Sequence, residues 1–318
     1  MNTFITVTKS QNLKVTKSKK LTCYMSSVFV FATFISFSQV KDTTKVNQLD
    51  EVLVSAVRVT TKTPVSFSNL DKKEIKFRNL GQDIPILMNY LPSVVTTSDA
   101  GNGVGYTGIR VRGSDATRVN VTINGIPYND SESHGTYWVN MPDFASSLES
   151  LQLQRGVGTS TNGAGAFGAS LNMLTDNFAK ESTGEISNSF GSFNTRKHTV
   201  KFSTGLMNDH FEIAGRLSAL NSDGYVDRGA SDLKSYFLQG TYVGKTTLIK
   251  ALVFGGKEKT YQSWNGIDGE TLNNDRTFNS AGAFTDEKGN ARFYDNETDN
   301  YQQDHSQLHW NEKISENW

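Results

Sequence analysis

Six segments after residue 181 constrain the fold of this chain most, because apolar and polar side chains alternate along each of them. In one segment, the odd-numbered residues 211–217 are mainly apolar and the even-numbered residues 212–218 are mainly polar. Successive side chains of a strand point to opposite faces, so one face suits lipid and the other a wet lumen. The pattern is typical of transmembrane β-barrel strands. The segments are GEISNSFGSF, TRKHTVKFSTG, HFEIAGRLSAL, KSYFLQGTYVG, KTTLIKALVFGG and HSQLHWNEKIS.

The connections between these segments differ in length. Residues 207–209 form a tight link, whereas residues 257–303 are long, polar and rich in aromatic side chains. Barrels of the outer membrane have short periplasmic turns and longer extracellular loops. We therefore expect the long loop to face the exterior.

Composition excludes several classes of protein. Only 36% of the 318 residues are hydrophobic, which argues against a helical membrane protein. Lys plus Arg and Asp plus Glu both number 32, so no basic excess favours a nucleic-acid partner. The single cysteine, Cys23, leaves no disulfide framework and no thiolate metal site.

The N-terminus has the order of regions found in an export signal. Several lysines precede an apolar run at residues 21–37, and small residues flank Phe37 at its end. A permanent membrane helix is the alternative, but the run is short and diluted by Ser and Thr. We predict a signal peptide at residues 1–38 and a mature chain that begins near Gln39. A flexible linker at residues 39–49 and a β-prone stretch at residues 50–58 follow.

Residues 59–178 are predicted to form a small α+β domain. Apolar residues at nearly helical spacing within residues 70–91 predict one amphipathic helix that begins near Asp83 and stops before Pro92. Two half-buried strands and a tight turn at Asn124-Gly125 are expected between residues 106 and 128. Leucines at residues 148–153 lead into a glycine-rich stretch, and the domain ends near Thr175.

Several motifs suggest other functions but fail in their context. The glycines of residues 163–168 match a dinucleotide fingerprint without a surrounding βαβ unit, and residues 240–247 fit a hairpin turn better than a phosphate-binding loop. His305 and His309 lack the glutamate of a metalloprotease helix, and residues 130–141 lack the closing glutamate of a calcium loop. We therefore expect no enzyme activity, no cofactor and no metal site.

Three segments together resemble TonB-dependent outer-membrane receptors. Residues 49–58, LDEVLVSAVR, resemble a TonB box, and residues 108–130, GIRVRGSDATRVNVTINGIPYND, resemble the core of a plug domain. Residues 148–175, LESLQLQRGVGTSTNGAGAFGASLNMLT, resemble the glycine-rich end of that plug. The resemblance implies a 22-stranded barrel with the plug in its lumen, of which residues 179–318 would form the first strands.

The resemblance also implies a function. Such receptors bind a scarce nutrient outside the cell and import it across the Gram-negative outer membrane with energy from the inner-membrane TonB complex. The short segment before the box favours a ferric siderophore, haem or a vitamin over an oligosaccharide, which stays an alternative. A surface-binding barrel without transport is the other alternative. Only six strand-like segments are present, so the chain is expected to be a fragment of a longer receptor, with TonB, outer-membrane lipid and an extracellular metal chelate as partners.

Two sets of residues are predicted to bind the partners, one set TonB and the other the ligand. The TonB-binding segment would add a strand to an exposed sheet edge of TonB, and it comprises Asp50, Glu51, Val52, Leu53, Val54 and Ser55. Ligand contacts are expected at the plug apex and in the long loop, where aromatic and polar side chains occur together. These residues are Asp99, Asn102, Tyr106, Asn129, Asp130, Tyr137, Trp138, Tyr261 and Trp264. Alternatively, Tyr137 and Trp138 pack the plug core and Trp264 lies at the membrane interface.

Overall fold

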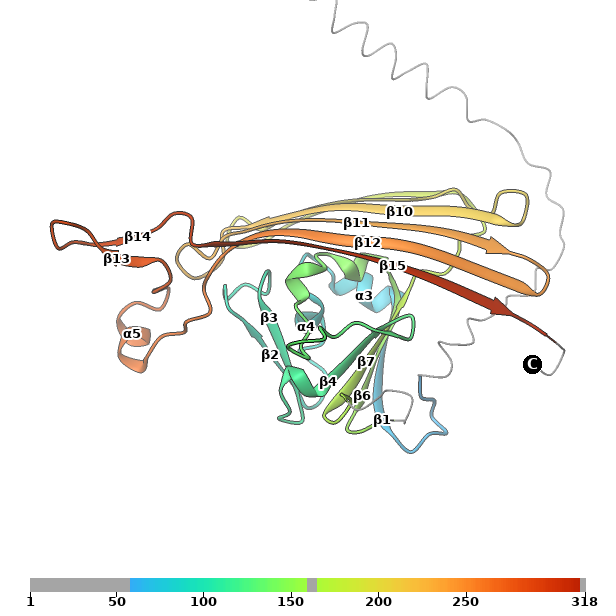
Figure 1. Ribbon diagram of the computed structural model, residues 1–318, viewed down its shortest axis with the longest axis horizontal. Coiled ribbons are helices and arrows are strands. Elements are labelled where there is room, and N and C mark those ends of the chain that lie inside the picture. Colours follow the sequence, from blue (N-terminus) through green and yellow to red (C-terminus); the bar gives the residue numbers. More distant parts are fainter. Residues whose placement is uncertain (1–57, 159–164, 315–318) are drawn as a thin grey trace, which may run out of the picture. The chain divides into compact units, whose positions relative to one another are not determined.

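The computed structural model describes residues 58–158 and 165–314, all within one compact unit that begins at Asn47. The expected signal peptide, linker and TonB-binding segment lie outside the described residues. Within the described part, short mixed elements come first and long antiparallel strands follow (Figure 1). None of the helices described here is long and apolar enough to cross a membrane.

The first part of the described chain is an α+β domain built on a five-stranded sheet of order β1-β6-β7-β4-β5. Strands β4 and β7 are parallel, and the other neighbours in this sheet are antiparallel. Strands β2 and β3 form a separate pair. The elements are β1 Ser66–Asp71, α3 Lys72–Arg78, α4 Ile84–Leu87, β2 Val94–Ser98, β3 Thr107–Val111, η1 Ala116–Arg118, β4 Val119–Ile123, β5 Ile126–Pro127, η2 Trp138–Asn140, η3 Phe144–Ser147, β6 Leu148–Arg155 and β7 Ala169–Thr175.

The prediction of one helix in residues 70–91 is wrong in part. Helix α4 does begin after Asp83, but a separate helix, α3, precedes it and strand β1 precedes that. Asp71 is the N-cap of α3, because its carboxylate accepts a hydrogen bond from the amide of Glu74 at 2.8 Å. Pro85 sits in the first turn of α4, a position where its missing N–H costs nothing.

Strand β4 is more deeply buried than the alternation of its side chains indicates. All five of its residues are buried, because β7 and β5 flank it within the sheet. Of its two polar side chains, Thr122 is paired, because its hydroxyl donates to Oδ1 of Asn172 at 2.7 Å, whereas Nδ2 of Asn120 has no hydrogen-bond partner among the described residues. The predicted turn at Asn124-Gly125 is confirmed, with φ angles of 52° and 81° that suit these two residues.

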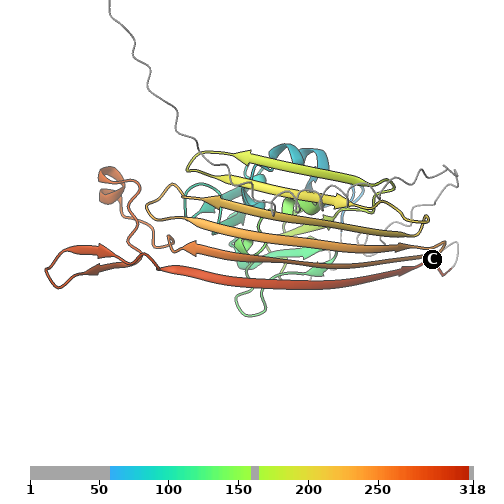
Figure 2. The same ribbon diagram turned by 90° about the horizontal axis from the view of Figure 1, so that it is seen from above.

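A six-stranded antiparallel sheet of order β15-β12-β11-β10-β9-β8 follows, and Figure 2 shows its strands side by side. All six alternating segments of the sequence are confirmed as strands. The long loop is shorter than predicted, because β12 and β15 remain paired as far as Tyr261 and Thr298. The elements are β8 Thr183–Phe190, β9 Arg196–Ser203, β10 Phe211–Ser222, β11 Ser231–Val243, β12 Thr247–Tyr261, α5 Gly269–Asn274, β13 Ala283–Thr285, β14 Ala291–Phe293 and β15 Thr298–Glu312.

This sheet has its apolar face outside and its polar face inside. Along β10, Ile213 and Leu217 are 46% and 65% exposed, whereas Glu212 and Arg216 are each 2% exposed. A sheet of a water-soluble protein would show the reverse distribution. The predicted assignment of the two faces of β10 is therefore confirmed, and its polar face is covered by the α+β domain.

Asp143 anchors the α+β domain to this polar face. Its carboxylate lies 3.1 Å from Nζ of Lys197 on β9 and 3.4 Å from Nη1 of Arg216 on β10. The hydroxyls of Thr199 and Ser218 donate to it at 2.6 and 2.7 Å. Burial alone would raise the pKa of the Asp143 carboxyl, but Arg216 and Lys197 outweigh burial and hold the pKa well below its usual range.

Apolar and backbone contacts surround this ion cluster. The Phe144 ring lies 5.1 Å from that of Phe254 on β12 and 6.2 Å from that of Phe237 on β11. At Gly256, an added Cβ would come within 2.3 Å of the carbonyl oxygen of Asn140. The backbone of η2 therefore lies directly on strand β12, and this close approach positions the residues that follow β5.

We expect Asp143→Asn to destabilise the protein strongly, because it leaves Lys197 and Arg216 buried without a counter-charge. Breaking a buried ion pair from one side costs about 3–5 kcal/mol. Denaturant unfolding of the purified protein would measure this loss, with Asp209→Asn in the exposed turn before β10 as control. Adding Lys197→Met to Asp143→Asn should restore part of the stability. An unchanged unfolding midpoint for Asp143→Asn would contradict the anchoring role.

Candidate ligand-binding site

A cavity of about 750 Å³ lies between the loop after β5 and strands β12 and β15. The α+β domain contributes aromatic and polar side chains from residues 106–140, and the large sheet contributes the ends of two strands and the loop between them. The lining residues are Tyr106, Tyr128, Asp130, Glu132, Ser133, Gly135, Thr136, Tyr137, Asn140, Glu258, Trp264, Asp299, Tyr301 and Gln303.

Aromatic rings form much of the wall of this cavity. The rings of Tyr106 and Trp264 meet edge to face, with centroids 5.3 Å apart and an interplanar angle of 84°. Tyr128 packs against His305 of β15 at a centroid distance of 4.9 Å. Tyr137 is 47% exposed and lines the same space. Such rings offer flat apolar surfaces to a ligand.

Carboxylates stand beside these rings. The Tyr106 hydroxyl donates to Oδ2 of Asp299 at 2.5 Å and lies 3.5 Å from Oε1 of Glu258. Burial, the hydrogen bond to Asp299 and the nearby negative charges raise the pKa of Tyr106 far above its usual value. Tyr106 is therefore a hydrogen-bond donor at neutral pH, and it links the α+β domain to both strands.

The loop after β5 is held in place by its own side chains. Asn129 accepts a hydrogen bond from the amide of Val121 at 2.7 Å and donates to the carbonyls of Val119 and His134. The Asp130 carboxylate accepts hydrogen bonds from the amide and the hydroxyl of Ser133 at 2.7 and 2.9 Å. The bond from the Ser133 amide is the main reason why the pKa of Asp130 is lowered.

Four of the nine residues predicted to contact ligand line the cavity together. Tyr106, Asp130, Tyr137 and Trp264 come from three separate segments of the chain, and the fold brings them to one place. Their contact with a ligand stays a prediction. Asn129, by contrast, uses its amide to fix the loop to β4, so it supports the cavity rather than lining it.

The other four residues lie elsewhere. Trp138 is 2% exposed and belongs to the main hydrophobic core, as the alternative interpretation of the sequence stated. Asp99 and Asn102 flank the β2–β3 turn, where Asn102 donates to the Ser222 hydroxyl at 2.6 Å. The Tyr261 hydroxyl donates to the carbonyl of Tyr294 at 2.6 Å and closes the base of the long loop.

Sequence reasoning missed the residues that β12 and β15 contribute, namely Glu258, Asp299, Tyr301 and Gln303. Glu258 pairs with Tyr301 in the ladder, and Gly256 pairs with Gln303. The alternation along each strand places these side chains on the inner face. These side chains meet because of the register between the two strands. That register depends on the long loop, and no feature of the sequence predicts it.

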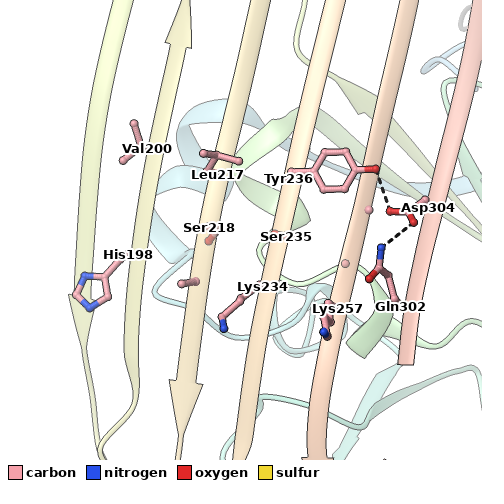
Figure 3. A pocket seen from close by; sticks show the side chains of 13 residues that line it. His198, Val200, Leu217, Ser218, Lys234, Ser235, Tyr236, Lys257, Gln302 and Asp304 are labelled. Carbon is pink, nitrogen blue, oxygen red and sulfur yellow. Dashed lines mark hydrogen bonds between the residues drawn. The ribbon is translucent and has the colours of Figure 1, made fainter. Parts of the chain in front are cut away.

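A second hollow, of about 500 Å³, lies on the apolar outer face of the large sheet. Figure 3 shows the Tyr236 hydroxyl and the Gln302 amide, which both donate to the Asp304 carboxylate at 2.9 Å. The Tyr236 ring lies close to Gly255, where an added Cβ would come within 2.9 Å of it. Leu217 in this hollow is 65% exposed, but Lys234, Lys257 and Asp304 also line it, so this part of the outer face is mixed in character.

Comparison with known proteins identifies the α+β domain. Residues 59–170 match the family model of the TonB-dependent receptor plug domain. No curated protein sequence matches the chain significantly. Residues 59–170 are therefore similar to the plug domain of TonB-dependent receptors, and the antiparallel strands that follow match the fold of such receptors. Members of this family are receptors and transporters rather than enzymes.

Solved structures agree with this assignment at the level of the fold. The ferric-catecholate import receptor Fiu from E. coli K12 matches with a TM-score of 0.61 and 15% identity, over 80% of this chain and 37% of that chain. FpvA of P. aeruginosa, bound to a ferric pyoverdine, matches with 0.59 and 13%, over 80% and 32%. The copper transporter OprC matches with 0.52 and 16%, over 61% and 31%. The chain thus spans about a third of the length of these structures.

Asp83 is a buried carboxyl of the α+β domain. It lies at the N-terminus of α4 and accepts a hydrogen bond from the hydroxyl of Thr107, the neighbour of Tyr106, at 2.9 Å. Burial is the main cause that raises the pKa of Asp83 from 3.8 to about 8, and the charge of Glu258 adds to it. Asp83 is therefore mostly neutral in the folded protein at pH 7.

We expect Asp83→Asn to remove part of the pH dependence of stability. In the native protein, stability should fall between pH 4 and pH 8, because the unfolded chain ionises at about 3.8 and the folded chain only near 8. At pH 7 the variant should be more stable by about 4 kcal/mol, about 1.4 kcal/mol for each pH unit, and near pH 4 the difference should vanish. Denaturant unfolding at both pH values measures this. The same pH dependence in the native protein and in Asp83→Asn would contradict it.

Proposed function

We propose that this chain is part of a receptor that binds a metal chelate outside the cell and imports it across the outer membrane with energy from TonB. The observation that carries this proposal is the plug domain itself, seated on the polar face of a sheet whose other face is apolar. A soluble protein has no use for an exposed apolar face of this extent. A plug domain that covers the polar face of such a sheet fits a transport channel that can be opened and closed.

The chemistry of the cavity supports a small ligand as cargo. Its volume of about 750 Å³ lies in the range of small-molecule sites, and its aromatic walls with a few polar groups are typical of them. We propose that Tyr106, Tyr137 and Trp264 contact the ligand through their rings and that Asp130 contacts it through its carboxylate. In this proposal, Asn129 and Trp138 hold the loop that presents these side chains.

The solved structures favour a metal-containing cargo. Fiu is an import receptor for ferric catecholates, FpvA was solved with a ferric pyoverdine, and OprC is a copper transporter. We therefore place a ferric siderophore first among the ligands, ahead of haem and vitamins. An oligosaccharide is the less favoured cargo. A surface-binding barrel without transport would leave the TonB-box resemblance of residues 49–58 without a purpose.

Energy coupling is proposed to run through residues 50–55. In an extended conformation, this segment would add a strand to TonB in the periplasm, with main-chain hydrogen bonds as the source of affinity. The described chain begins just after this segment. Arg58 donates to the carbonyl of Asn172 at 2.9 Å, and the amide of Val59 donates to Oε1 of Gln152 at 2.9 Å. A pull on the segment would therefore act on strands β6 and β7 of the plug.

We expect Val52→Pro to abolish uptake while ligand binding stays normal. Proline removes one N–H and fixes φ, so it disrupts the added strand without changing any residue of the cavity. Uptake of radioactive iron by cells and binding of the same chelate to outer membranes would measure the two steps separately. Val46→Pro, in the preceding linker, is the matched control. Normal uptake by Val52→Pro, with the protein shown to be in the outer membrane, would contradict the proposal.

A further inference from the structure

The charged side chains that line the cavity are acidic. Four of its lining residues carry carboxylates, and none of the described lining residues is a lysine or arginine. Lys257 and Lys259 are close in sequence, but the alternation of β12 turns both away from the inner face that carries Glu258. The carboxylates are those of Asp130, Glu132, Glu258 and Asp299.

Buried polar atoms at the cavity also call for a hydrogen-bond donor. Asn140 is only 9% exposed, and its side-chain oxygen has no hydrogen-bond partner among the described residues. The hydroxyl of Thr136, which also lines the cavity, has none there either. A buried amide oxygen without a donor costs about 1–3 kcal/mol, so a donor group on a ligand would recover free energy here.

The two carboxylates nearest Tyr106 repel each other. Glu258 and Asp299 both lie within 3.5 Å of the Tyr106 hydroxyl, which has one proton to donate, and the Thr260 hydroxyl donates to the other Glu258 oxygen at 2.8 Å. A cation placed between them would relieve the repulsion. The rings of Tyr106 and Trp264 add a further attraction, because the faces of aromatic rings favour cations.

These observations do not indicate a bare metal ion. Within residues 58–158 and 165–314, no group of three or more His, Cys, Asp or Glu side chains is arranged to hold one. An organic ammonium group differs from a metal ion, because it keeps its own N–H donors and fits a wide aromatic cage. The cavity therefore suits a positively charged organic group.

We infer that the cavity takes a cationic, hydrogen-bond-donating part of the cargo, such as an ammonium group on a ferric chelate, and disfavours ferric catecholates. The statement that this ligand is imported cargo rests on the proposed function. Dianionic catecholates around Fe³⁺ leave an excess of negative charge, which the acidic wall would repel. Monoanionic hydroxamates neutralise the metal, so a free amine makes such a chelate cationic. The match to Fiu thus extends to the fold but not to its ligand.

Two inert cobalt complexes of opposite charge test the chemistry of the cavity without knowledge of the cargo. Hexaamminecobalt(III) is cationic and carries N–H donors, whereas hexacyanocobaltate(III) is anionic and carries only acceptors. Each is titrated into the purified full-length protein in detergent at physiological salt. The fluorescence of Trp264, obtained as the difference between the native protein and Trp264→Phe, reports the binding.

We expect saturable quenching by the cation and none by the anion. Glu258→Gln with Asp299→Asn should weaken cation binding about tenfold or more, because two charges beside the ligand are lost. Asp130→Asn should weaken cation binding several-fold. Because this variant leaves the hydrogen bonds of Tyr106 intact, it still tests the inference if the double variant misfolds. Glu287→Gln, on the exposed part of the long loop, should change nothing. Cation binding that neither cavity variant weakens, or preferred binding of the anion, would overturn the inference.

Uptake of paired chelates separates this inference from the proposed function. The pair is a radioactive ferric trihydroxamate with a free amine and the same compound with its amine acetylated. Faster uptake of the free amine supports both proposals, and faster uptake of a ferric triscatecholate overturns the inference alone. If the cobalt cation binds as expected but none of the three chelates enters the cell, the inference about the cavity holds and the proposed import function fails.

Discussion

The contact of Asp143 with Lys197 and Arg216 is the interaction on which the rest of the structure depends. The inner face of the large sheet carries charged side chains that neither lipid nor an apolar core can accept, and burying them requires counter-charges. The plug supplies one at Asp143, together with carbonyl oxygens of Pro142 and Asp143 that face Arg216. The plug therefore supplies the counter-charge and the hydrogen-bond acceptors that the buried charged side chains of the inner face need.

The same contact fixes the geometry of the candidate site. Asp143 lies three residues after Asn140, the end of η2, where the backbone closely approaches Gly256, so the anchor also sets the distance between the plug loop and β12. Tyr106 makes a second connection between the plug and the large sheet, to Glu258 of β12 and Asp299 of β15. The cavity is therefore bounded by two connections between the plug and the large sheet.

Sequence reasoning predicted the strands well and the site incompletely, for physical reasons. Alternation reveals which face of β10 is polar, because a strand has a period of two residues. It does not reveal that Asp143 neutralises Lys197 and Arg216, which are 54 and 73 residues away in the chain. Both Trp138 and Trp264 are aromatic candidates in the sequence, and only packing separates the core residue from the cavity residue.

A cysteine scan along Phe211–Ser222 with spin labels tests most directly which face of the large sheet meets lipid. Lipid-soluble oxygen and a water-soluble nickel chelate would be compared as relaxing agents for the protein in lipid vesicles. The account predicts a period of two, with odd-numbered positions such as Ile213 and Leu217 accessible to oxygen and even-numbered positions such as Arg216 protected from it. Equal accessibility along the strand, or oxygen contact at the even-numbered positions, would contradict it.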